Sequence, residues 1–538
     1  MIELGACRAD VNGDGIINLA DVLLVAAAWP ARAGEPGYDP DLEMNSDGVI
    51  NVIDIQLAAG RIGMTCAEAP PLPTPASTAT STPSATATAS PTRTATPTAT
   101  AAATPTATGT PDGSRRPWPD TGRGIHVFND QLAGDMSDAQ AAFAVTHYDG
   151  TQKMTRDQAD RLRAADPDFL ILHYRLGHGL GYRAVNPPCQ PTGAWLHVIE
   201  GDDWVQEWPG GANVVESWFY HWPEAGSTRV LNCDWGWYLM ELDDAGWRAY
   251  WHDEVLRQVQ ANDADGVFMD SLSVPNYLMA DHYDPNLPDV DAAFESAWAA
   301  RIEDWLGWLQ GRSLGDYYLV PNVGEWITSR ETTDYSAADG LMVKGFAIAA
   351  DASPFALADW QLQMNRTLAA VGLSQALLLQ TTATGSQERM FALGSYLLVK
   401  GGRTYLNIEL DLAPEWWPEY DIAIGAPTES AGADIATLYD AANQVYRRDF
   451  EDGFVLVNPT NPWDGTGRTA TVNLGGTYYL AQTSGGGEVP PDGTRPGSVS
   501  YSPVVSVILP PYSAAVLLNA APAGFRAEAH IAAGNRVR

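Results

Sequence analysis

The sequence predicts a multidomain chain: a small α-helical module built on calcium loops, a disordered linker, a (β/α)8 TIM barrel and a C-terminal antiparallel β-sandwich. Three observations lead to this prediction. A twelve-residue calcium-loop pattern occurs twice near the N-terminus, a Thr/Pro/Ala-rich segment follows it, and eight apolar runs alternating with helical stretches come next. The 538 residues also exceed the roughly 250–300 residues that one hydrophobic core organises.

The first element is a pair of loops rich in the side-chain oxygens that Ca²⁺ prefers. Such a loop supplies ligands from positions 1, 3, 5, 7, 9 and 12, with glycine at position 6 for a sharp turn. Gly15 and Gly48 occupy that position. The predicted ligands are Asp10, Asn12, Asp14, Ile16, Asn18 and Asp21 in the first loop and Glu43, Asn45, Asp47, Val49, Asn51 and Asp54 in the second. Ile16 and Val49 would use their backbone carbonyls. The alternative, a solvated acidic turn, would have to occur twice.

An apolar stretch follows each loop, at residues 22–29 and 55–59, and predicts an exiting helix, whereas neither loop has a clear entering helix. With aspartate as the last ligand of both loops, residues 7–66 resemble a type I dockerin, a module that attaches an enzyme to a cohesin-bearing protein. The resemblance implies that residues 1–67 bind two Ca²⁺ ions and a cohesin-type partner. Glu43 departs from the aspartate expected there, so the second site could be weaker or rearranged. So small a module should fold only with Ca²⁺.

Residues 68–117 consist almost entirely of Thr, Pro, Ala and Ser. This composition cannot bury a core, and repeated proline favours extended polyproline geometry. At about 3.1 Å per residue the segment could reach on the order of 100 Å. The sequence therefore predicts a disordered, O-glycosylated tether between an anchoring module and a working module.

The four cysteines fall into two spaced pairs, one on either side of the calcium loops and one in a loop-rich region further on. Disulfides Cys7–Cys66 and Cys189–Cys233 in an exported protein are the simplest interpretation, with two pairs of free buried thiols as the alternative. The chain is therefore expected to be secreted or attached to a cell surface, although no signal peptide is visible at its N-terminus.

The composition makes some partners improbable. The formal net charge is −35 and only three residues are lysine, so nucleic acid is a poor partner. No apolar run reaches the roughly 18 residues of a membrane-spanning helix, so no membrane span is expected. The 19 Trp and 21 Tyr residues are enough both to fill a core and to provide flat surfaces for sugar rings.

Residues 118–438 are predicted to form the barrel, because eight continuous apolar strands alternating with helices are typical of that fold. The predicted strands are residues 124–128, 143–148, 169–174, 266–270, 317–322, 340–346, 376–381 and 404–408. Residues 291–310 form the clearest helix, with apolar side chains at helical spacing. Residues 218–222 and 229–233 are alternative strands. Otherwise the chain makes a loop of about 90 residues after the third strand, a length typical of a binding lid.

After about residue 438 the pattern becomes β-rich and is punctuated by glycine and proline. The predicted strands are residues 453–458, 469–474, 477–481 and 504–518. Residues 439–520 are therefore predicted to form an antiparallel β-sandwich, and residues 521–538 a disordered tail.

Two carboxylates follow the fourth and fifth predicted strands, where a barrel of this kind carries its active site. They are Asp270 and Glu325. Glycoside hydrolysis requires a pair of carboxyl groups flanking the scissile bond, about 5–5.5 Å apart for retention and about 6.5–9.5 Å apart for inversion. Asp270 and Glu325 are the candidates for this pair, with Glu331 and Glu409 as alternatives to Glu325. The structural alternative is that each carboxylate pairs with an arginine or caps a helix.

Further polar side chains stand at or just after the predicted strand ends. The predicted substrate-binding residues are Tyr148, Asp149, His173, Arg175, Asn322, Trp326, Lys344, Gln380, Asn407 and Glu409. Each of them could be a satisfied structural group. Together they favour a polyhydroxylated ligand, whose hydroxyl groups both donate and accept hydrogen bonds.

The strand that ends at Asp270 resembles the nucleophile strand of the α-amylase and α-galactosidase barrels, and Glu325 matches the position of the α-amylase acid. This resemblance implies that Asp270 is the nucleophile and Glu325 the general acid/base, and we expect a retaining mechanism. Residues 146–153, 265–270 and 339–346 resemble a sequence-defined group, glycoside hydrolase-like family fifteen, over about residues 120–440. This resemblance implies an extracellular hydrolase of O-glycosidic bonds in a poly- or oligosaccharide, and the barrel shows no motif for a catalytic cofactor. The alternatives are a non-catalytic glycan-binding or cell-surface protein and a different barrel enzyme, such as a lyase or an acyl-transfer hydrolase.

Overall fold

The computed structural model describes residues 115–522 with short gaps, together with isolated residues between positions 11 and 50. The gaps are residues 182–183, 186–189, 192–194, 197–205, 208–214, 222–228, 233–236, 276–289, 350–351, 384 and 410–413. The chain divides into two compact units, Met1–Pro105 and Thr106–Arg538. All four cysteines lie outside the described residues, as do residues 68–114 of the predicted linker and all but the first two residues of the predicted tail, so these assignments stay predictions.

In the first unit, strand β1 (Ala31–Arg32) pairs antiparallel with β2 (Val49–Ile50). Leu24 and Val25 are helical, as expected for the helix after the first loop. Ile17 and Ile50 occupy the eighth position of the two predicted calcium loops, and both are fully buried. Among the predicted ligands only Asp21 and Val49 are described residues; the other ten lie outside them, so both calcium sites stay predictions.

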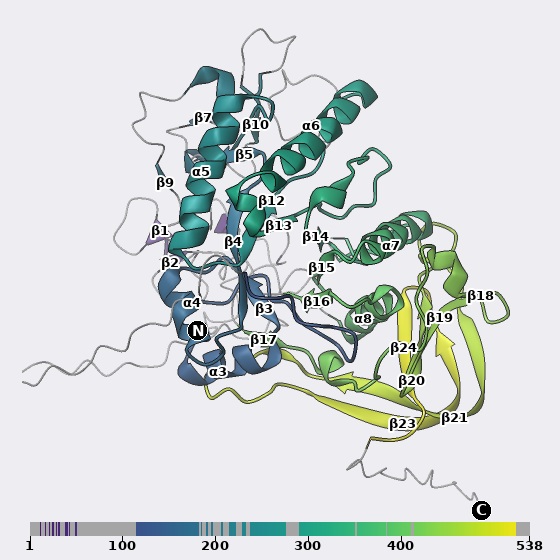
Figure 1. Cartoon of the computed structure of the whole chain (residues 1–538). Helices are drawn as coiled ribbons and strands as arrows, with labels where there is room; N and C mark the ends of the chain where they lie inside the picture. Colours follow the sequence, from purple (N-terminus) through teal and green to yellow (C-terminus); the bar gives the residue numbers. More distant parts are fainter. Residues whose placement is uncertain are drawn as a thin grey trace, which may run out of the picture. The chain divides into compact units, whose positions relative to one another are not determined.

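The second unit contains a closed barrel of eight parallel strands (Figure 1). The strands are residues 127–128, β3 (Gly150–Gln152), β4 (Leu170–Leu176), β12 (Gly266–Asp270), β13 (Tyr318–Pro321), β14 (Gly340–Lys344), β15 (Ala376–Thr381) and β16 (Thr404–Ile408). Parallel ladders join most neighbours. Single parallel bridges, Val127–Leu406, Phe128–Gly150 and Asn322–Met342, complete the circle. The predicted TIM-barrel-like core is therefore confirmed.

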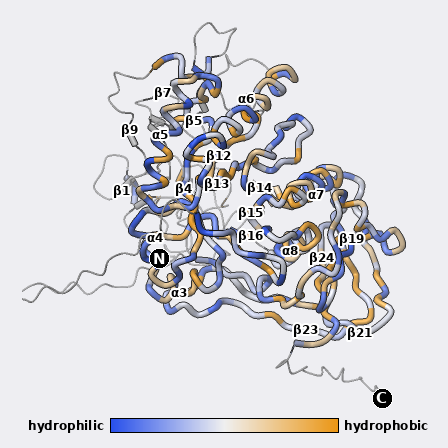
Figure 2. The backbone as a smooth tube through the Cα atoms, in the orientation of Figure 1, coloured by the Kyte–Doolittle hydropathy of each residue, from blue (hydrophilic) through white to orange (hydrophobic). Residues whose placement is uncertain are grey.

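Helices cover the outside of this barrel. They are α3 (Asp138–His147), α4 (Arg156–Arg163), α5 (Ala245–Ala261), α6 (Ala292–Gln310), α7 (Leu357–Gly372) and α8 (Ser386–Val399). Asp291 caps α6 by accepting the backbone N–H of Phe294 at 2.8 Å, which places the predicted helix of residues 291–310 correctly. Buried Trp251 of α5 and Trp305 of α6 pack edge to face, with ring centroids 5.2 Å apart. Apolar and polar stretches alternate along α7 (Figure 2), as expected for a helix with one buried face, whereas residues 389–399 of α8 are all buried.

The predicted strand at residues 143–148 is wrong, because all but the last of these residues belong to helix α3. Ser137 accepts the backbone N–H of Gln140, and the Gln140 side chain accepts the backbone N–H of Ser137, so a capping box starts the helix. The second barrel strand is Gly150–Gln152 instead. Glycine is required at its start because a Cβ on Gly150 would lie 2.6 Å from the carbonyl oxygen of Leu170.

Inside the barrel, every second residue of each strand points to the axis and the side chains stack in layers. The middle of the barrel is apolar. Its buried cluster includes Leu172, Tyr174, Phe268, Val320, Met342, Leu378 and Tyr405. At the N-terminal end of the strands, which we call the barrel floor, Trp118 packs on Tyr318 at 5.0 Å between ring centroids and on Tyr405 at 5.7 Å. The opposite, C-terminal end is called the barrel mouth.

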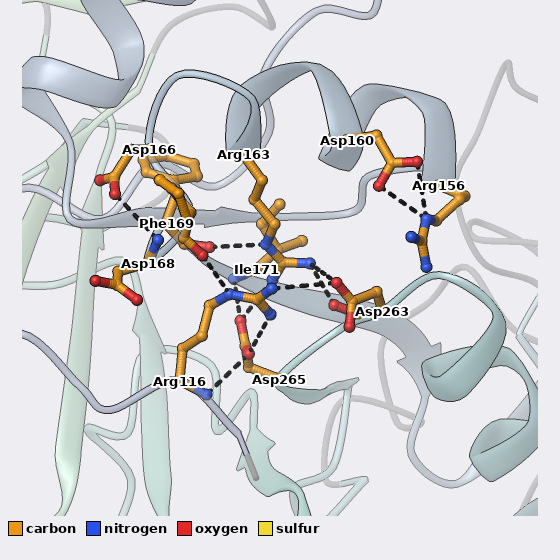
Figure 3. Close-up of polar contacts among 11 residues, drawn as sticks. Arg116, Arg156, Asp160, Arg163, Asp166, Asp168, Phe169, Ile171, Asp263 and Asp265 are labelled. Atoms are coloured by element: carbon orange, nitrogen blue, oxygen red, sulfur yellow. Dashed lines mark hydrogen bonds and ion pairs between the residues drawn. The ribbon is translucent and has the colours of Figure 1, made fainter. Parts of the chain in front are cut away.

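A buried ion-pair cluster fastens the chain to the barrel floor (Figure 3). Asp265, only 1% exposed and just before β12, accepts hydrogen bonds from Arg116 Nη1 at 3.0 Å and Arg163 Nη2 at 2.7 Å. It also accepts the backbone N–H of Ile171 at 2.9 Å. Asp263 pairs with both arginines at 3.1 Å. The cluster therefore ties residues 115–118 and α4 to two barrel strands, far from the mouth.

The long excursion after β4 forms a small sheet of its own. Its strand order is β10 (Leu231–Asn232), β11 (Trp237–Leu239), β5 (Gly179–Gly181), β8 (Trp195–Leu196) and β9 (Gln206–Glu207), with a separate hairpin of β6 (Ala184–Val185) and β7 (Gln190–Pro191). Residues 218–222 and 229–233 are thus not barrel strands among the described residues. None of the described helices combines the length and the apolar character that crossing a bilayer requires.

The C-terminal region contains one six-stranded antiparallel sheet, which confirms the predicted antiparallel strands, while their arrangement as a β-sandwich stays a prediction. The strand order of the sheet is β18 (Tyr439–Asp440), β19 (Val445–Phe450), β20 (Gly453–Asn458), β24 (Ser513–Leu518), β21 (Ala470–Ser484) and β23 (Ser498–Leu509), and a short β17 (Glu415–Trp416) pairs separately with β22 (Gly487–Glu488). A register shift between Asn473 and Tyr478 joins two predicted strands into the single strand β21. One face packs closely on α8, where a Cβ on Gly394 would lie 2.5 Å from the Cβ of Ala514.

Candidate active site

The inward-facing positions at the barrel mouth are polar, whereas those below them are apolar. The strands alternate so that the residues two positions beyond the apolar layer also face the axis. These residues are Gln152 on β3, Asp270 on β12, Asn322 after β13, Lys344 on β14, Gln380 on β15 and Asn407 on β16, with the hydroxyl of Tyr174 from β4 at the same level. Four of these side chains are buried, those of Gln152, Asn322, Gln380 and Asn407, and burying polar groups is costly unless they have partners or a ligand.

Asp270 is held in one orientation by its neighbours. Its Oδ2 accepts the hydroxyl of Tyr174 at 2.7 Å, and its Oδ1 accepts Asn322 Nδ2 at 2.7 Å and the backbone N–H of Ser271 at 2.8 Å. Ser271 has φ 55°, a strained conformation for a residue other than glycine. The side chain is partly exposed at the mouth. A carboxylate fixed by three donors is pre-organised for a reaction at a single point.

A buried ion pair that the sequence analysis missed lies beside Asp270. Lys153 Nζ contacts Asp130 Oδ2 at 2.7 Å, and the amide of Gln152 also donates to Asp130. Lys153 lies 5.4 Å from the ring centroid of Tyr174, the residue that donates to Asp270. Burial alone would lower the pKa of Lys153, but Asp130, Glu409 and Asp270 outweigh it and the net pKa is raised. The lysine therefore carries its charge among three carboxyl groups.

Glu409, directly after β16, has the most unusual acidity at the mouth. Burial and the neighbouring Asp130 carboxylate raise the pKa of Glu409 to about 8, against the opposing effect of Lys153 and Lys344. Its carboxyl group therefore holds a proton at neutral pH. A carboxyl group kept protonated at neutral pH can act as a proton donor.

Glu325 lies in the loop after β13 and packs over the end of β14. A Cβ on Gly345 would lie only 2.7 Å from Glu325 Cγ, which places the glutamate next to Lys344. The following residue, Trp326, has φ 58°, which is rare for a bulky side chain. Both residues line a cavity of about 470 Å³. Glu331, an alternative for the acid/base role, also lines this cavity. Its side chain is buried and accepts the backbone N–H groups of Val274 at 2.6 Å and Thr333 at 3.1 Å. Glu331 therefore stabilises the loop that follows β13.

His178 is a second residue that the sequence analysis missed. It is fully buried after β4, and its ring lies 5.5 Å from that of Trp237 and 5.8 Å from that of Trp298. Burial lowers the pKa of His178 to about 3, with Asp270 acting in the opposite direction. A neutral imidazole therefore lies within electrostatic reach of Asp270. No periodic signal in the sequence marks this residue, because it follows the strand in an irregular segment.

The predicted positions of His173 and Arg175 at the mouth are wrong. They alternate with the inward-facing Tyr174 and point to the outside of the barrel, where His173 Nε2 lies 3.1 Å from Gln258 Oε1 of α5. Burial lowers the pKa of Arg175 to about 9, and Glu254 of the same helix opposes the effect. Both side chains therefore belong to the packing between β4 and α5.

The predicted positions of Tyr148 and Asp149 are also wrong, because the second strand begins after them. The Tyr148 hydroxyl donates to the carbonyl oxygen of Glu415 at 2.5 Å, outside the barrel. Asp149 lies at the floor end of β3, with Oδ2 2.9 Å from His126 Nδ1. Burial lowers the pKa of His126, but its hydrogen bond to the Asp149 carboxylate, the negative charge of that carboxylate and the carbonyl oxygen of Arg123 together outweigh burial, so the net pKa is raised.

Several buried amides at the mouth have polar atoms with no hydrogen-bond partner among the described residues. They are both side-chain polar atoms of Gln380, Nδ2 of Asn407 and Oε1 of Gln152. Gln380 is 1% exposed, so neither of its atoms is freely hydrated. Since an unpaired buried polar group costs about 1–3 kcal/mol, these groups are suited to a ligand with many hydroxyl groups. Within the described part of the chain, no group of three or more His, Cys, Asp or Glu side chains is arranged to hold a metal ion.

The family described as hypothetical glycosyl hydrolase family 15 matches residues 163–454, more than half of the chain. The match begins later than the resemblance expected from the sequence and leaves out residues 146–153, but it includes residues 265–270 and 339–346. No curated protein matches the chain.

Three solved structures are similar over part of the chain. A Paenibacillus sp. cycloisomaltooligosaccharide glucanotransferase with cycloisomaltoheptaose shares 10% identity over 73% of this chain and 55% of its own, at a TM-score of 0.31. An Arthrobacter globiformis T6 isomalto-dextranase with panose shares 14% sequence identity, over 75% of this chain and 74% of its own, at a TM-score of 0.33. A Geobacillus thermoleovorans α-amylase with acarbose shares 11% sequence identity, over 73% of this chain and 97% of its own, at a TM-score of 0.31. This chain thus spans only about half of the Paenibacillus protein. At these scores the likeness establishes no shared fold, and the barrel rests on its own strand pairing.

Proposed function

Because the chain belongs to hypothetical glycosyl hydrolase family 15, we propose that it hydrolyses O-glycosidic bonds of a poly- or oligosaccharide at the barrel mouth. The observation that carries this proposal is the layer of inward-facing polar side chains around Asp270, several of them buried without partners among the described residues. A packed barrel does not need such a layer, whereas a ring of sugar hydroxyls would satisfy it.

In this proposal Asp270 is the nucleophile. Its carboxylate oxygen attacks the anomeric carbon while the glycosidic C–O bond breaks, and the departing oxygen takes a proton from a second carboxyl group. Water then hydrolyses the glycosyl–Asp270 ester and returns its proton to that second group. Tyr174 and Asn322 hold Asp270 in place for both steps. Gln380, Asn407, Lys344 and Trp326 are proposed to contact the sugar.

Two residues compete for the role of proton donor. Glu325 follows the fifth barrel strand, which is the position that the sequence assignment gives to the acid. It also lies over the end of β14. Glu409 is favoured by a separate observation, since its raised pKa of about 8 keeps it protonated at neutral pH. We keep Glu325 as the first assignment and Glu409 as the second.

The test is product release from a panel of α- and β-linked polysaccharides by the wild type and by Asp270→Asn, Glu325→Gln and Glu409→Gln. Loss of the nucleophile should lower kcat by several orders of magnitude, and loss of the acid by roughly 10²–10⁴-fold. Asp253→Asn, at a side chain 80% exposed on α5, is the matched control and should keep full activity. If the wild type releases no sugar while all variants bind a glycan equally, the barrel is a binding platform and the hydrolase proposal fails.

We also propose that residues 1–67 anchor the secreted enzyme through two Ca²⁺ ions and a cohesin-type partner. The repeated loop pattern supports this, as does the burial of Ile17 and Ile50 at equivalent positions of the two loops. The full chain should bind two Ca²⁺ by calorimetry, and Asp14→Ala and Asp47→Ala should each remove one. Binding of no Ca²⁺ by the wild type would rule out the anchor.

A further inference from the structure

Trp463 is the most exposed of the large apolar side chains in the described part of the chain, at 77%. It lies in the loop between β20 and β21. A single exposed apolar residue is ordinary on a protein surface and needs no explanation by itself. What distinguishes Trp463 is that its loop is firmly anchored on both sides of it.

The anchor is a set of side-chain hydrogen bonds to the β14–α7 loop. Asn461 is buried, and its Nδ2 donates to the carbonyl oxygens of Pro354 at 2.9 Å and Phe355 at 3.0 Å. Its Oδ1 accepts the backbone N–H of Trp463 at 2.8 Å. The tryptophan is therefore attached through one amide side chain to the loop that leaves the barrel after Lys344.

The other side of the loop is fixed by Asp464. Its Oδ2 accepts the backbone N–H of Leu357, the first residue of α7, at 3.3 Å. Its Oδ1 accepts the backbone N–H of Thr466 at 2.7 Å and closes a turn in which Gly465 has φ 82°. A carboxylate at the first turn of a helix is also favoured by the helix dipole. The indole is thus presented to solvent by a pre-formed turn.

These contacts place Trp463 on the mouth side of the molecule. The β14–α7 loop starts at the mouth, where Lys344 ends β14, and α7 begins there before running back toward the floor. Pro354, to which Asn461 is bonded, forms a bridge with Ile348 within the same loop. The loop that carries the indole is therefore attached outside the ring of strands, at the same end of the barrel as Asp270.

We propose that Trp463 is an accessory carbohydrate-binding platform that holds an outlying stretch of the saccharide chain whose bond lies at Asp270. The inference rests on the proposed function and adds that the substrate is a long chain rather than a short oligosaccharide. Stacking on the apolar face of a sugar ring removes both surfaces from water. Because the turn is already ordered, little conformational entropy is lost on binding.

The test compares Trp463→Ala and Trp463→Phe with the wild type on a cleaved polysaccharide and on a short fragment of it. Trp463→Ala should raise KM for the polysaccharide roughly two- to tenfold, leave kcat unchanged and leave kcat/KM for the short fragment unchanged. Trp463→Phe should restore part of the loss. Ile508→Ala, at a side chain 68% exposed on β23, is the control and should not change KM. Equal KM for the polysaccharide in Trp463→Ala and the wild type would overturn the inference.

The platform can still be tested if the hydrolase proposal fails. If the wild type cleaves nothing, affinity electrophoresis on the same polysaccharides replaces kinetics. Retardation of the wild type that is weakened in Trp463→Ala but kept in Asp270→Asn supports the platform on its own. Equal retardation of Trp463→Ala and the wild type, or none for any protein, overturns the platform as well. Thermal unfolding at the same Tm verifies that each variant is folded.

Discussion

At the residue scale, the protonation of Glu409 changes the charge of the barrel mouth near neutral pH. Its pKa of about 8, raised from the ordinary 4.5 by burial and Asp130, means that the folded protein binds a proton there that the unfolded chain releases. The stability that this proton contributes is complete below about pH 4.5 and is lost as pH rises through about 8. The neighbouring Lys153 stays charged over the same range, because the net effect of three carboxyl groups raises its pKa.

Glu409→Gln should therefore flatten the pH dependence of stability between about pH 4.5 and 8, because glutamine keeps the shape of the neutral acid without the proton. The measurement is Tm against pH for wild type and variant, with the exposed Glu488→Gln as control. If Glu409 is also the proton donor, wild-type kcat should fall above about pH 8 and the variant should lose this limb. Parallel Tm profiles for the two proteins would contradict the assignment.

Strand alternation determines how much of the site the sequence could predict. Asp270, Asn322, Lys344 and Gln380 were found because each ends an apolar run and faces inward. The predictions for His173 and Arg175 failed because β4 is buried on both faces and carries polar side chains on its outer face too, so its sequence does not say which residues face the axis. Lys153 was not predicted as a site residue because the sequence does not mark the strand it follows, and Asp130 and His178 were not predicted because they lie in irregular segments after their strands.

At the scale of elements, β3 is a barrel strand that the apolar pattern of the sequence does not predict. Gly150-Thr-Gln152 lacks the apolar run of a barrel strand, whereas the aromatic-rich residues 143–148 have one and are nevertheless helical. The capping box at Ser137 decides the outcome, and its Ser-x-x-Gln spacing is visible in the sequence. By contrast β12, β15, β16 and β20 have the predicted bounds, since continuous β-branched and aliphatic residues leave few alternatives.

Gly150→Ala should destabilise the barrel by about 1–3 kcal/mol, because the added methyl group would lie 2.5 Å from the ring of Phe128 and 2.6 Å from the carbonyl oxygen of Leu170. Gly307→Ala is the control. Nothing lies within 4 Å of a Cβ at that position in α6, so the variant should gain about 0.5–1 kcal/mol of stability. Urea unfolding measures both. A Gly150→Ala variant as stable as the wild type would show that β3 can shift without cost.

For the whole molecule, the floor cluster joins the start of the second unit to the barrel. Asp265→Ala would leave Arg116 and Arg163 with only the more exposed Asp263 as a carboxylate partner, and should lower the free energy of unfolding by up to about 3–5 kcal/mol. Asp160→Ala breaks an exposed pair with Arg156 on α4 and should cost less than about 1 kcal/mol. Urea denaturation compares the two variants. Similar small losses would mean that solvent reaches the floor.

The order of modules in the chain follows from composition alone, because a Thr/Pro/Ala-rich segment cannot contribute to a core. The shape of the C-terminal sheet does not follow. The sequence predicts two separate strands where the structure has the single strand β21, because the register shift between Asn473 and Tyr478 falls at Gly475 and Gly476, which resemble a turn.

The position of the floor cluster has a mechanical consequence. Residues 115–118 enter the barrel at the end opposite the mouth and are held there by Arg116 and the buried ring of Trp118. A pulling force that reaches the enzyme through the preceding segment is therefore borne by ion pairs beneath the barrel. The strand ends that carry Asp270 and its partners lie at the other end of the barrel and bear none of this load directly.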